Sequence, residues 1–360
     1  MREVLINGRF LAAKPAGVQR VAAGLITGMD ACLSDATELA EPRFTLIKPV
    51  QSQRDLPLAR ILTRTAGRLN GQPWEQIELP WLAREATLVN LCNLGPLTHP
   101  RSITMIHDAQ VFLSPHSYSR AFRSWYMFAL PRIGARALKI LTVSEYSRQQ
   151  LIQFKVASAD RIVVVPNGVD HLRRVAPDQS VLNDLNLAQR PFVLGLANTQ
   201  THKNVSLLLK AFASPRLSEV TLVLMGPASE ADFAALGLHL PPNVVIAGLV
   251  TDGQMRSLME AARALAFPST TEGFGLPPLE AMSLGCPTIV APCGALPEVC
   301  GEASLYADPD DVEAWVAGIV QLVEDPDASR AKSIAGLEQA AKFTWAKSST
   351  KLLNIIKSLS

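Results

Sequence analysis

The chain has 360 residues, of which 48% are hydrophobic and 18% are charged, and its formal net charge at pH 7 is +2. This composition excludes a disordered chain and is typical of a well-packed globular protein. A pI of about 8.3 is close to neutral, so no overall field indicates nucleic acid as a partner. The length suffices for two domains of ordinary size, each with its own core.

Cysteine usage and apolar segments exclude further classes of protein. The five cysteines are an odd number and form no Cys-x-x-Cys pair, so we expect neither a disulfide framework nor a zinc or redox site. The first residues lack the apolar core of a signal peptide, and no stretch reaches the roughly 18 apolar residues of a membrane-spanning helix. We therefore expect a cytoplasmic protein whose membrane contact would be peripheral, on the inner face of the cytoplasmic membrane.

Short apolar runs alternate along the chain with segments long enough for a helix. In the first half they span residues 4–7, 44–47, 87–91, 102–106, 140–143 and 162–165. In the second half they span residues 192–196, 220–225, 244–247, 264–267, 288–291 and 304–306. Such runs are typical of buried parallel strands in doubly wound α/β domains. The sequence therefore predicts two of these domains, at residues 1–170 and 171–344. An amphipathic helix is expected over residues 343–359.

The most informative segment follows the apolar run 264–267, where Glu272 and Glu280 are separated by seven residues. Glycines in this loop allow close approach of the backbone, and Pro277 and Pro278 favour the first turn of a helix. A strand, a glycine-rich loop and a helix N-terminus together form an anion site. Carboxylates bind phosphate poorly, so the two glutamates are expected to accept hydrogen bonds from hydroxyls. A ligand with a diphosphate and several hydroxyls is a nucleotide sugar.

Residues 272–282 resemble the Glu-x7-Glu motif of the retaining, GT-B-fold glycosyltransferases of family 4. Further segments resemble family landmarks in the usual order, at residues 17–21, 106–108, 142–147, 165–170, 202–204, 224–226 and 296–299. The overall pattern is most similar to bacterial mannosyltransferases that build surface polysaccharides.

The resemblance implies two facing Rossmann-like domains with a cleft between them. The first domain would lie on the acceptor side and the second would bind the nucleotide sugar, with residues 345–360 forming a helix that crosses back to the first domain. The implied reaction is a retaining transfer without a metal or other cofactor, with mannose from GDP-mannose as the expected sugar. A lipid-linked oligosaccharide is the implied acceptor.

By resemblance, Glu272, His107 and Lys203 are the catalytic candidates. Glu272 is expected to face the donor sugar, His107 to contact that sugar near the attacked carbon, and Lys203 to neutralise the diphosphate. Asp108 is expected either to orient His107 or to cap the next helix.

The donor-binding candidates surround these three residues. Glu280 is expected in the first turn of its helix, holding the ribose hydroxyls, with capping electrostatics as the alternative. Many relatives carry an arginine near Lys203 that is missing from this chain, which leaves Arg20 and Asn198 as the two candidates to replace it. Backbone N–H groups complete the expected donor site, from Gly17, Gly273, Phe274, Gly275 and Leu276.

Two other charged segments have competing interpretations. The Asp-x-Asp sequences at residues 308–310 and 325–327 could suggest a metal, but we expect N-caps because Asp310 and Asp311 precede a helical run. The basic, aromatic segment 120–139 favours either peripheral contact with anionic lipid or a solvated face. Arg132, Arg136 and Lys139 are expected on one helix face.

Three other functions remain to be compared with glycosyl transfer. A nucleotide-sugar epimerase on the same fold would need acid–base carboxylates beyond the two glutamates. A catalytically inactive homologue would act as a binding or scaffold subunit. An NAD-dependent dehydrogenase is disfavoured, because no Gly-x-Gly-x-x-Gly follows a predicted strand.

Overall fold

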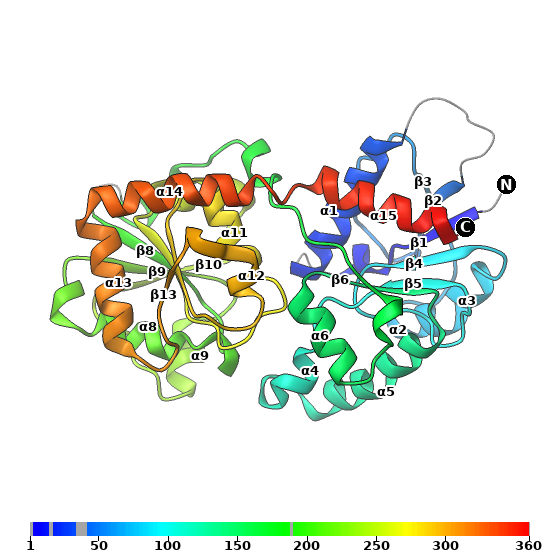
Figure 1. Cartoon of the computed structure of the whole chain (residues 1–360), viewed down its shortest axis with the longest axis horizontal. Helices are drawn as coiled ribbons and strands as arrows, with labels where there is room; N and C mark the ends of the chain where they lie inside the picture. Colours follow the sequence, from blue (N-terminus) through cyan, green and yellow to red (C-terminus); the bar gives the residue numbers. More distant parts are fainter. Residues whose placement is uncertain (1–2, 14–16, 34–41, 188–189, 360) are drawn as a thin grey trace. The chain divides into compact units, whose positions relative to one another are not determined.

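A computed structural model describes residues 3–13, 17–33, 42–187 and 190–359 (Figure 1). The chain divides into two compact units, Met1–Gly168 with Thr344–Ser360, and Val169–Phe343. The boundaries expected from the sequence lie within two residues of this division. None of the described helices is long and apolar enough to span a membrane.

In the first unit the described strands form a seven-stranded sheet of order β3-β2-β1-β4-β5-β6-β7, and every pairing is parallel. Its strands are β1 (Glu3–Asn7), β2 (Arg43–Lys48), β3 (Leu62–Thr65), β4 (Thr87–Asn90), β5 (Ser102–Met105), β6 (Lys139–Thr142) and β7 (Ile162–Val164). Its helices are α1 (Gly17–Cys32), α2 (Gly71–Pro73), α3 (Leu79–Leu82), α4 (Gln110–Leu113), α5 (Arg120–Arg136), α6 (Glu145–Gln153) and α15 (Trp345–Leu359).

The second unit has a six-stranded parallel sheet of order β10-β9-β8-β11-β12-β13 in its described residues. Its strands are β8 (Phe192–Leu196), β9 (Thr221–Met225), β10 (Val244–Gly248), β11 (Ala264–Phe267), β12 (Thr288–Val290) and β13 (Leu305–Tyr306). Its helices are α7 (Ser180–Asp184), α8 (Val205–Phe212), α9 (Glu230–Ala235), α10 (Asp252–Ala261), α11 (Leu276–Ser283), α12 (Leu296–Cys300), α13 (Val312–Glu324) and α14 (Pro326–Ala340).

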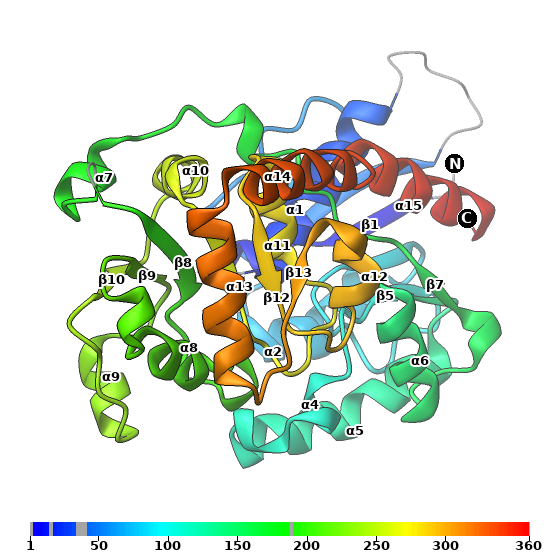
Figure 2. The same ribbon diagram turned by 60° about the vertical axis from the view of Figure 1, so that its left-hand side comes forward.

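Helices cover both faces of each sheet, which explains the continuous apolar runs. In the second unit one apolar core joins α8 and α13 to the sheet, and another joins α7, α10 and α11 to its opposite face (Figure 2). Strands buried on both faces have no polar side to alternate with. All twelve predicted runs are strands, with ends that differ by at most one residue. The prediction of two doubly wound α/β domains is confirmed.

Strand β3 was not predicted. Its sequence, Leu62–Thr65, has one apolar residue, and all four residues are exposed. It pairs with β2 alone, at the edge of the sheet. An edge strand is held by backbone hydrogen bonds and needs little apolar burial, so hydrophobicity carried no signal for it.

The C-terminal helix α15 packs along α1 of the first unit, as expected (Figures 1 and 2). Trp345, Leu352 and Ile356 are buried, and the Ser349 hydroxyl donates to the Leu25 carbonyl at 3.0 Å. Gly24 permits this close packing, because a Cβ there would lie 2.6 Å from the Trp345 ring.

Both sheets contain a topological switch point, the place where the strand order reverses direction. In the first sheet it lies between β1 and β4, and in the second it lies between β8 and β11. Connections diverge there to opposite faces of the sheet, which leaves a crevice at the carboxyl ends of the strands. Each switch point is therefore the expected ligand site of its own unit.

Candidate active site

The loop after β11 reaches helix α11 through a residue that must be glycine. Gly275 has a φ of 99°, and a Cβ on it would lie 2.6 Å from the Leu296 side chain. Next to it, the Phe274 ring is buried and packs edge-on against Phe343, with ring centroids 5.8 Å apart. The loop is thus anchored by one buried ring and shaped by one left-handed glycine.

Backbone donors are concentrated at the N-terminus of α11. Among the described residues, the N–H groups of Phe274, Gly275 and Leu276 have no hydrogen-bond acceptor. Pro277 and Pro278 occupy the following positions and have no N–H group. The unpaired N–H groups at this helix end therefore belong to residues that the sequence predicted to bind the nucleotide sugar. The helix dipole makes the same position favourable for an anion.

Lys203 and Glu272 meet at the second switch point. Lys203 follows β8 and Glu272 follows β11, and the Lys203 Nζ lies 2.6 Å from Glu272 Oε1. Their side chains are 17% and 13% exposed, so the pair is largely buried. The Thr270 N–H donates to the His202 carbonyl at 2.8 Å, which ties the two loops together. Two predicted site residues 69 positions apart in the chain are thus in direct contact.

Gly294 packs against the backbone of Glu272, and the sequence did not predict it as a residue of the site. It has a φ of 63°, and a Cβ there would lie 2.5 Å from the Glu272 backbone. The following residue, Ala295, donates its N–H to the Glu272 carbonyl at 3.0 Å. Its position in the loop directly after the predicted strand 288–291 could have indicated this role.

Glu280 lies in the second turn of α11, and the expectation of a first-turn position is wrong. It is the fifth residue of the helix, and the first turn has no acidic residue. The helix begins at Leu276, directly after Gly275, and the two prolines follow in its first turn, so Glu280 falls in the second turn. Its carboxylate is 3.3 Å from His171 Nε2 and is almost buried. Capping electrostatics therefore do not explain Glu280, and His171 is a partner that sequence reasoning missed.

The loop after β8 shapes the surroundings of Lys203. The Asn198 side-chain oxygen accepts from the Gln200 N–H at 2.8 Å, so this side chain forms the loop that leads to Lys203. Its amide nitrogen has no partner in the part of the chain that the structure describes. Burial and the charge of Lys203 together lower the pKa of the neighbouring His202 to about 4, although the charge of Glu272 acts in the opposite direction. His202 is therefore neutral at pH 7.

In the first unit, His107 follows β5 and is buried. Its Nε2 lies 2.9 Å from the Leu91 carbonyl, and its backbone N–H donates to Asn93 Oδ1 at 2.8 Å. A carbonyl only accepts, so Nε2 carries the proton and Nδ1 is the basic nitrogen. Burial lowers the pKa of His107 to about 4, which keeps the ring neutral. Asp108 accepts from the Gln110 N–H at 3.0 Å, as a residue at the start of α4 would.

Gly17 and Arg20 lie in the first turn of α1, and both belong to the first unit with His107. Gly17 has an ordinary negative φ, and a Cβ there would meet nothing within 4 Å. The fold itself therefore does not require a glycine at this position.

Gly17→Ala is expected to leave the melting temperature unchanged and to weaken nucleotide-sugar binding about 10-fold, if a ligand approaches the backbone here. Thermal unfolding and calorimetric titration measure the two effects. Unchanged ligand affinity would remove Gly17 from the site. Gly24→Ala is the matched contrast, because it should lower the melting temperature by clashing with Trp345.

One of the Asp-x-Asp residues, Asp325, caps a helix, whereas Asp308 accepts from the Asp310 N–H at 2.9 Å and the next residue, Asp311, is the cap of α13. Asp311 accepts from the Ala314 N–H at the start of α13, and Asp325 accepts from two N–H groups at the start of α14. Among the described residues, no group of three or more histidine, cysteine, aspartate or glutamate side chains is arranged to hold a metal ion.

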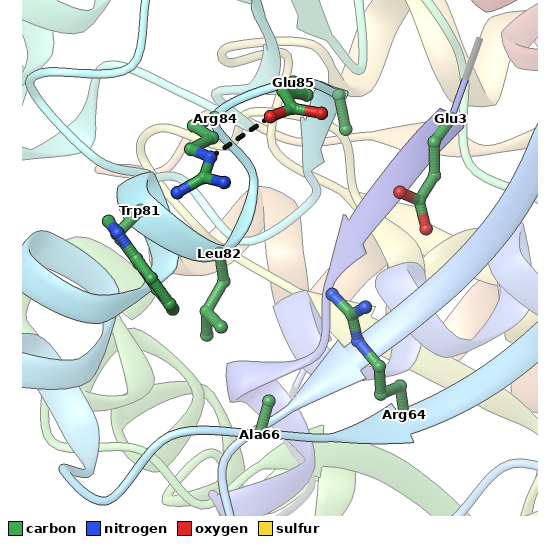
Figure 3. Close-up of a pocket in the computed structure, with 8 residues that line it drawn as sticks. Glu3, Arg64, Ala66, Trp81, Leu82, Arg84 and Glu85 are labelled. Atoms are coloured by element: carbon green, nitrogen blue, oxygen red, sulfur yellow. Dashed lines mark hydrogen bonds and ion pairs between the residues drawn. The ribbon is translucent and has the colours of Figure 1, made fainter.

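A hollow of about 360 Å³ lies in the first unit, and Asn7 and Asn90 at the switch point of that unit do not line it (Figure 3). Glu3 at the start of β1 and the segment before β4 line it, including the exposed Trp81 and the Arg84–Glu85 pair. A second hollow of about 350 Å³ lies near the start of β8, beside Phe192. None of the predicted site residues lines either hollow, so size alone does not locate the site.

Solved structures of low sequence identity have the same fold. Sucrose-phosphate synthase from Thermosynechococcus elongatus matches with a TM-score of 0.76 at 18% identity, over 100% of this chain and 99% of that chain. The Anabaena protein HepE, solved in complex with UDP-glucose, matches with a TM-score of 0.73 at 18% identity, over 99% and 100% of the two chains. Two Rossmann-like domains of this kind define a GT-B glycosyltransferase fold.

Sequence comparisons identify the family. The model of "Glycosyl transferases group 1" matches residues 182–342, and that of "Glycosyltransferase Family 4" matches residues 32–173. O-antigen chain mannosyltransferase B of Escherichia coli is 33% identical over 72% of this chain and 71% of its own length. O-antigen chain mannosyltransferase RfbU of Salmonella typhimurium is 26% identical over 65% and 64%. The chain belongs to glycosyltransferase family 4, and it is a glycosyltransferase.

Proposed function

We propose that this protein transfers mannose from GDP-mannose to a lipid-linked oligosaccharide, with retention of anomeric configuration and without a metal ion. The reaction would serve surface polysaccharide synthesis at the cytoplasmic side of the membrane. The observation that carries the proposal is the Lys203–Glu272 pair at the second switch point, beside the free N–H groups of α11. The names of the mannosyltransferase relatives support the choice of sugar.

Lys203 and the start of α11 would neutralise the leaving diphosphate. A departing nucleoside diphosphate develops negative charge, and fixed cations and N–H dipoles stabilise that charge without reorganising. Lys203 supplies the cation, and Phe274, Gly275 and Leu276 supply the dipoles. Asn198 adds a neutral amide donor in the loop before Lys203, which is our candidate to replace the missing arginine.

Glu272 would change partners when the donor binds. Without donor it accepts from Lys203 at 2.6 Å. A diphosphate carries more negative charge than one carboxylate, so it would draw Lys203 towards itself. The freed Glu272 carboxylate would then accept hydrogen bonds from the sugar hydroxyls and stabilise positive charge at the attacked carbon.

His107 would act as a neutral acceptor in the first unit. Its Nε2 proton is engaged with Leu91, which leaves the Nδ1 lone pair for a sugar hydroxyl. A buried, neutral imidazole orients a hydroxyl without adding a charge that would oppose the developing cation of the sugar.

Calorimetric titration of GDP, UDP, ADP and their common sugar conjugates in EDTA tests the donor. GDP-mannose should bind most tightly, and NMR of the product should show the anomeric configuration of the donor. Tight binding of another nucleotide sugar would overturn the choice of mannose. Conversion of the donor without acceptor would indicate an epimerase, and absence of any binding would indicate a scaffold protein.

Glu280→Gln is expected to weaken GDP binding about 10-fold, because a charge-assisted hydrogen bond to the ribose is replaced by a neutral one. Turnover at saturating donor should stay within about threefold, since Glu280 would contact a part of the donor that does not react. Titration with GDP and steady-state kinetics measure the two effects. Unchanged GDP affinity would contradict the ribose role.

We further propose that α5 contacts anionic lipid. Phe122 and Phe128 on this helix are 40% and 45% exposed, and the Arg132 guanidinium lies 3.6 Å from the centre of the Phe128 ring. Arg120 and Arg136 lie on the same helix. Lys139 does not, contrary to expectation, because the helix ends at Arg136 and Lys139 begins β6. Exposed rings among arginines suit the interface of an anionic membrane.

The double variant Phe122→Ser/Phe128→Ser is expected to lose most binding to vesicles that contain phosphatidylglycerol, because both rings leave the interface. Vesicle flotation measures the bound fraction. Leu236→Ser is the matched control, since Leu236 is 56% exposed in the second unit. Equal binding of all three proteins would contradict the role of α5.

A further inference from the structure

The switch point of the first sheet carries a polar cluster that the donor site does not use. Asn7 ends β1 and Asn90 ends β4, and the Asn7 amide donates to Asn90 Oδ1 at 3.0 Å. The same amide donates to Glu75 Oε1 at 2.8 Å, and Asn90 donates to the Thr104 hydroxyl at 3.1 Å. These buried groups gather at the carboxyl ends of the strands, where doubly wound sheets bind ligands.

Arg9 is the member of this cluster that reaches the surface. Its Nε donates to Glu75 Oε1 at 2.9 Å, and the two side chains are 25% and 1% exposed. Glu75 therefore lies beneath Arg9 and fixes the direction of its guanidinium. Among the described residues, the two terminal nitrogens of Arg9 have no acceptor. The fork of the guanidinium is thus held at one nitrogen and free at the other two.

Stability alone does not account for this pair. Burying a charge pair is weakly favourable at best, because the desolvation of both groups offsets their attraction. Here the pair forms one hydrogen bond, and the second oxygen of Glu75 is buried without a partner. Incomplete buried polar networks are costly and are expected where a ligand completes them. Glu75 also lies in the π-helical turn Trp74–Glu78, a local irregularity that is frequent at functional sites.

A further contact places the cluster near the start of α1, the helix that begins at Gly17. Cys92 follows β4 and donates to the carbonyl of Val18, the residue after Gly17. Burial raises the pKa of Cys92 to about 12, and the charges of Arg9 and Glu75 act on it in opposite directions. The cluster therefore lies next to the start of α1 within the first unit.

The charge balance of the cluster favours a neutral ligand. Glu75 compensates Arg9, so the pair carries no net charge. Burial raises the pKa of the nearby Tyr126 to about 12; the charge of Arg9 opposes this rise, and the charges of Glu75 and Asp108 add to it. At the second switch point the free N–H groups of α11 add to the charge of Lys203 and favour a diphosphate, whereas the described residues of this cluster offer the Arg9 fork beside a compensating carboxylate, which suits sugar hydroxyls.

We propose that the guanidinium of Arg9, positioned by Glu75 at the switch point between β1 and β4, binds the hydroxyls of the acceptor saccharide. This inference rests on the proposed glycosyl transfer. Each sheet then uses a cation–carboxylate pair at its switch point, Lys203–Glu272 for the donor and Arg9–Glu75 for the acceptor.

Steady-state kinetics of Arg9→Ala tests the proposal, with GDP-mannose and the p-nitrophenyl glycoside that the wild type glycosylates fastest. The acceptor KM should rise about 10-fold or more, which is the loss of one charged hydrogen bond. The donor Kd and kcat should stay within about twofold, because in the proposed role Arg9 would contact neither the diphosphate nor the reacting carbon. Arg9→Lys should recover only part of the affinity, since an ammonium lacks the fork.

Two further variants separate binding from folding. Glu75→Gln keeps an oxygen for Asn7 and Arg9 and should raise the acceptor KM with little change in melting temperature. Arg84→Ala removes an exposed pair with Glu85 and should leave every constant unchanged. A weakened donor Kd with unchanged acceptor KM in Arg9→Ala would overturn the proposal. So would a lower melting temperature with unchanged KM, which would make the pair structural. Failure of the wild type to bind any nucleotide sugar would instead reject the proposed function.

Discussion

Glu272→Gln is expected to lower kcat by about 10²-fold to 10³-fold, the cost of removing one group that stabilises charge in the transition state. Glutamine keeps the shape of the side chain but cannot stabilise positive charge on the sugar. The donor Kd should change by less than about threefold, because the lost interaction would form in the transition state and contribute little to binding of the donor in its ground state. Single-turnover kinetics and titration with GDP-mannose give the two values.

A matched control separates this role from a general effect of charge. Glu219 is exposed and precedes β9, away from the second switch point. Glu219→Gln should behave like the wild type in both measurements. Equal turnover of Glu272→Gln and wild type would contradict the assignment of Glu272, and a Kd that weakens as much as kcat falls would make it a binding residue.

Lys203→Ala is expected to lower kcat/KM for the donor by about 10²-fold or more, because the leaving diphosphate loses its cation. Unlike Glu272→Gln, this variant should also weaken the binding of GDP alone. Kinetics and GDP titration measure both, and Lys210→Ala, an exposed lysine of α8, is the control. Unchanged GDP affinity would remove Lys203 from the diphosphate site.

The contact between Lys203 and Glu272 adds a test that requires no substrate. Lys203→Ala leaves the Glu272 carboxylate largely buried and unpaired, which should cost about 1–3 kcal/mol of unfolding free energy. Adding Glu272→Gln removes that charge and should recover part of the loss. Chemical denaturation of both single variants and of the double variant gives the coupling energy. Strict additivity would contradict the pairing.

The local pattern of residue types was sufficient to predict the central strands and the Glu272–Glu280 motif. Strands buried on both faces leave continuous apolar runs, so β1 and β8 were predictable with nearly their observed ends. The glycine-rich loop and the prolines in the first turn of α11 were also predicted, because backbone preference is a property of each residue type. Strand β3 was not, since its stability comes from pairing with β2.

The sequence did not predict which side chains contact one another. The sequence indicated that Glu272, Glu280 and Lys203 belong to one site, by motif and resemblance. It carried no information that Lys203 pairs with Glu272, or that Glu280 meets His171. Such contacts join loops that follow different strands, and the register and order of the sheet bring them together.

The sequence by itself determined the two α/β domains and the family, because these depend on local periodicity and on residue types at fixed spacing. Only the tertiary structure decided that Arg9 and Glu75 form a pair at the first switch point. Those residues are 66 positions apart, and neither belongs to a recognisable motif. Their meeting depends on how the π-helical turn packs against the ends of β1 and β4, which is a property of the assembled sheet.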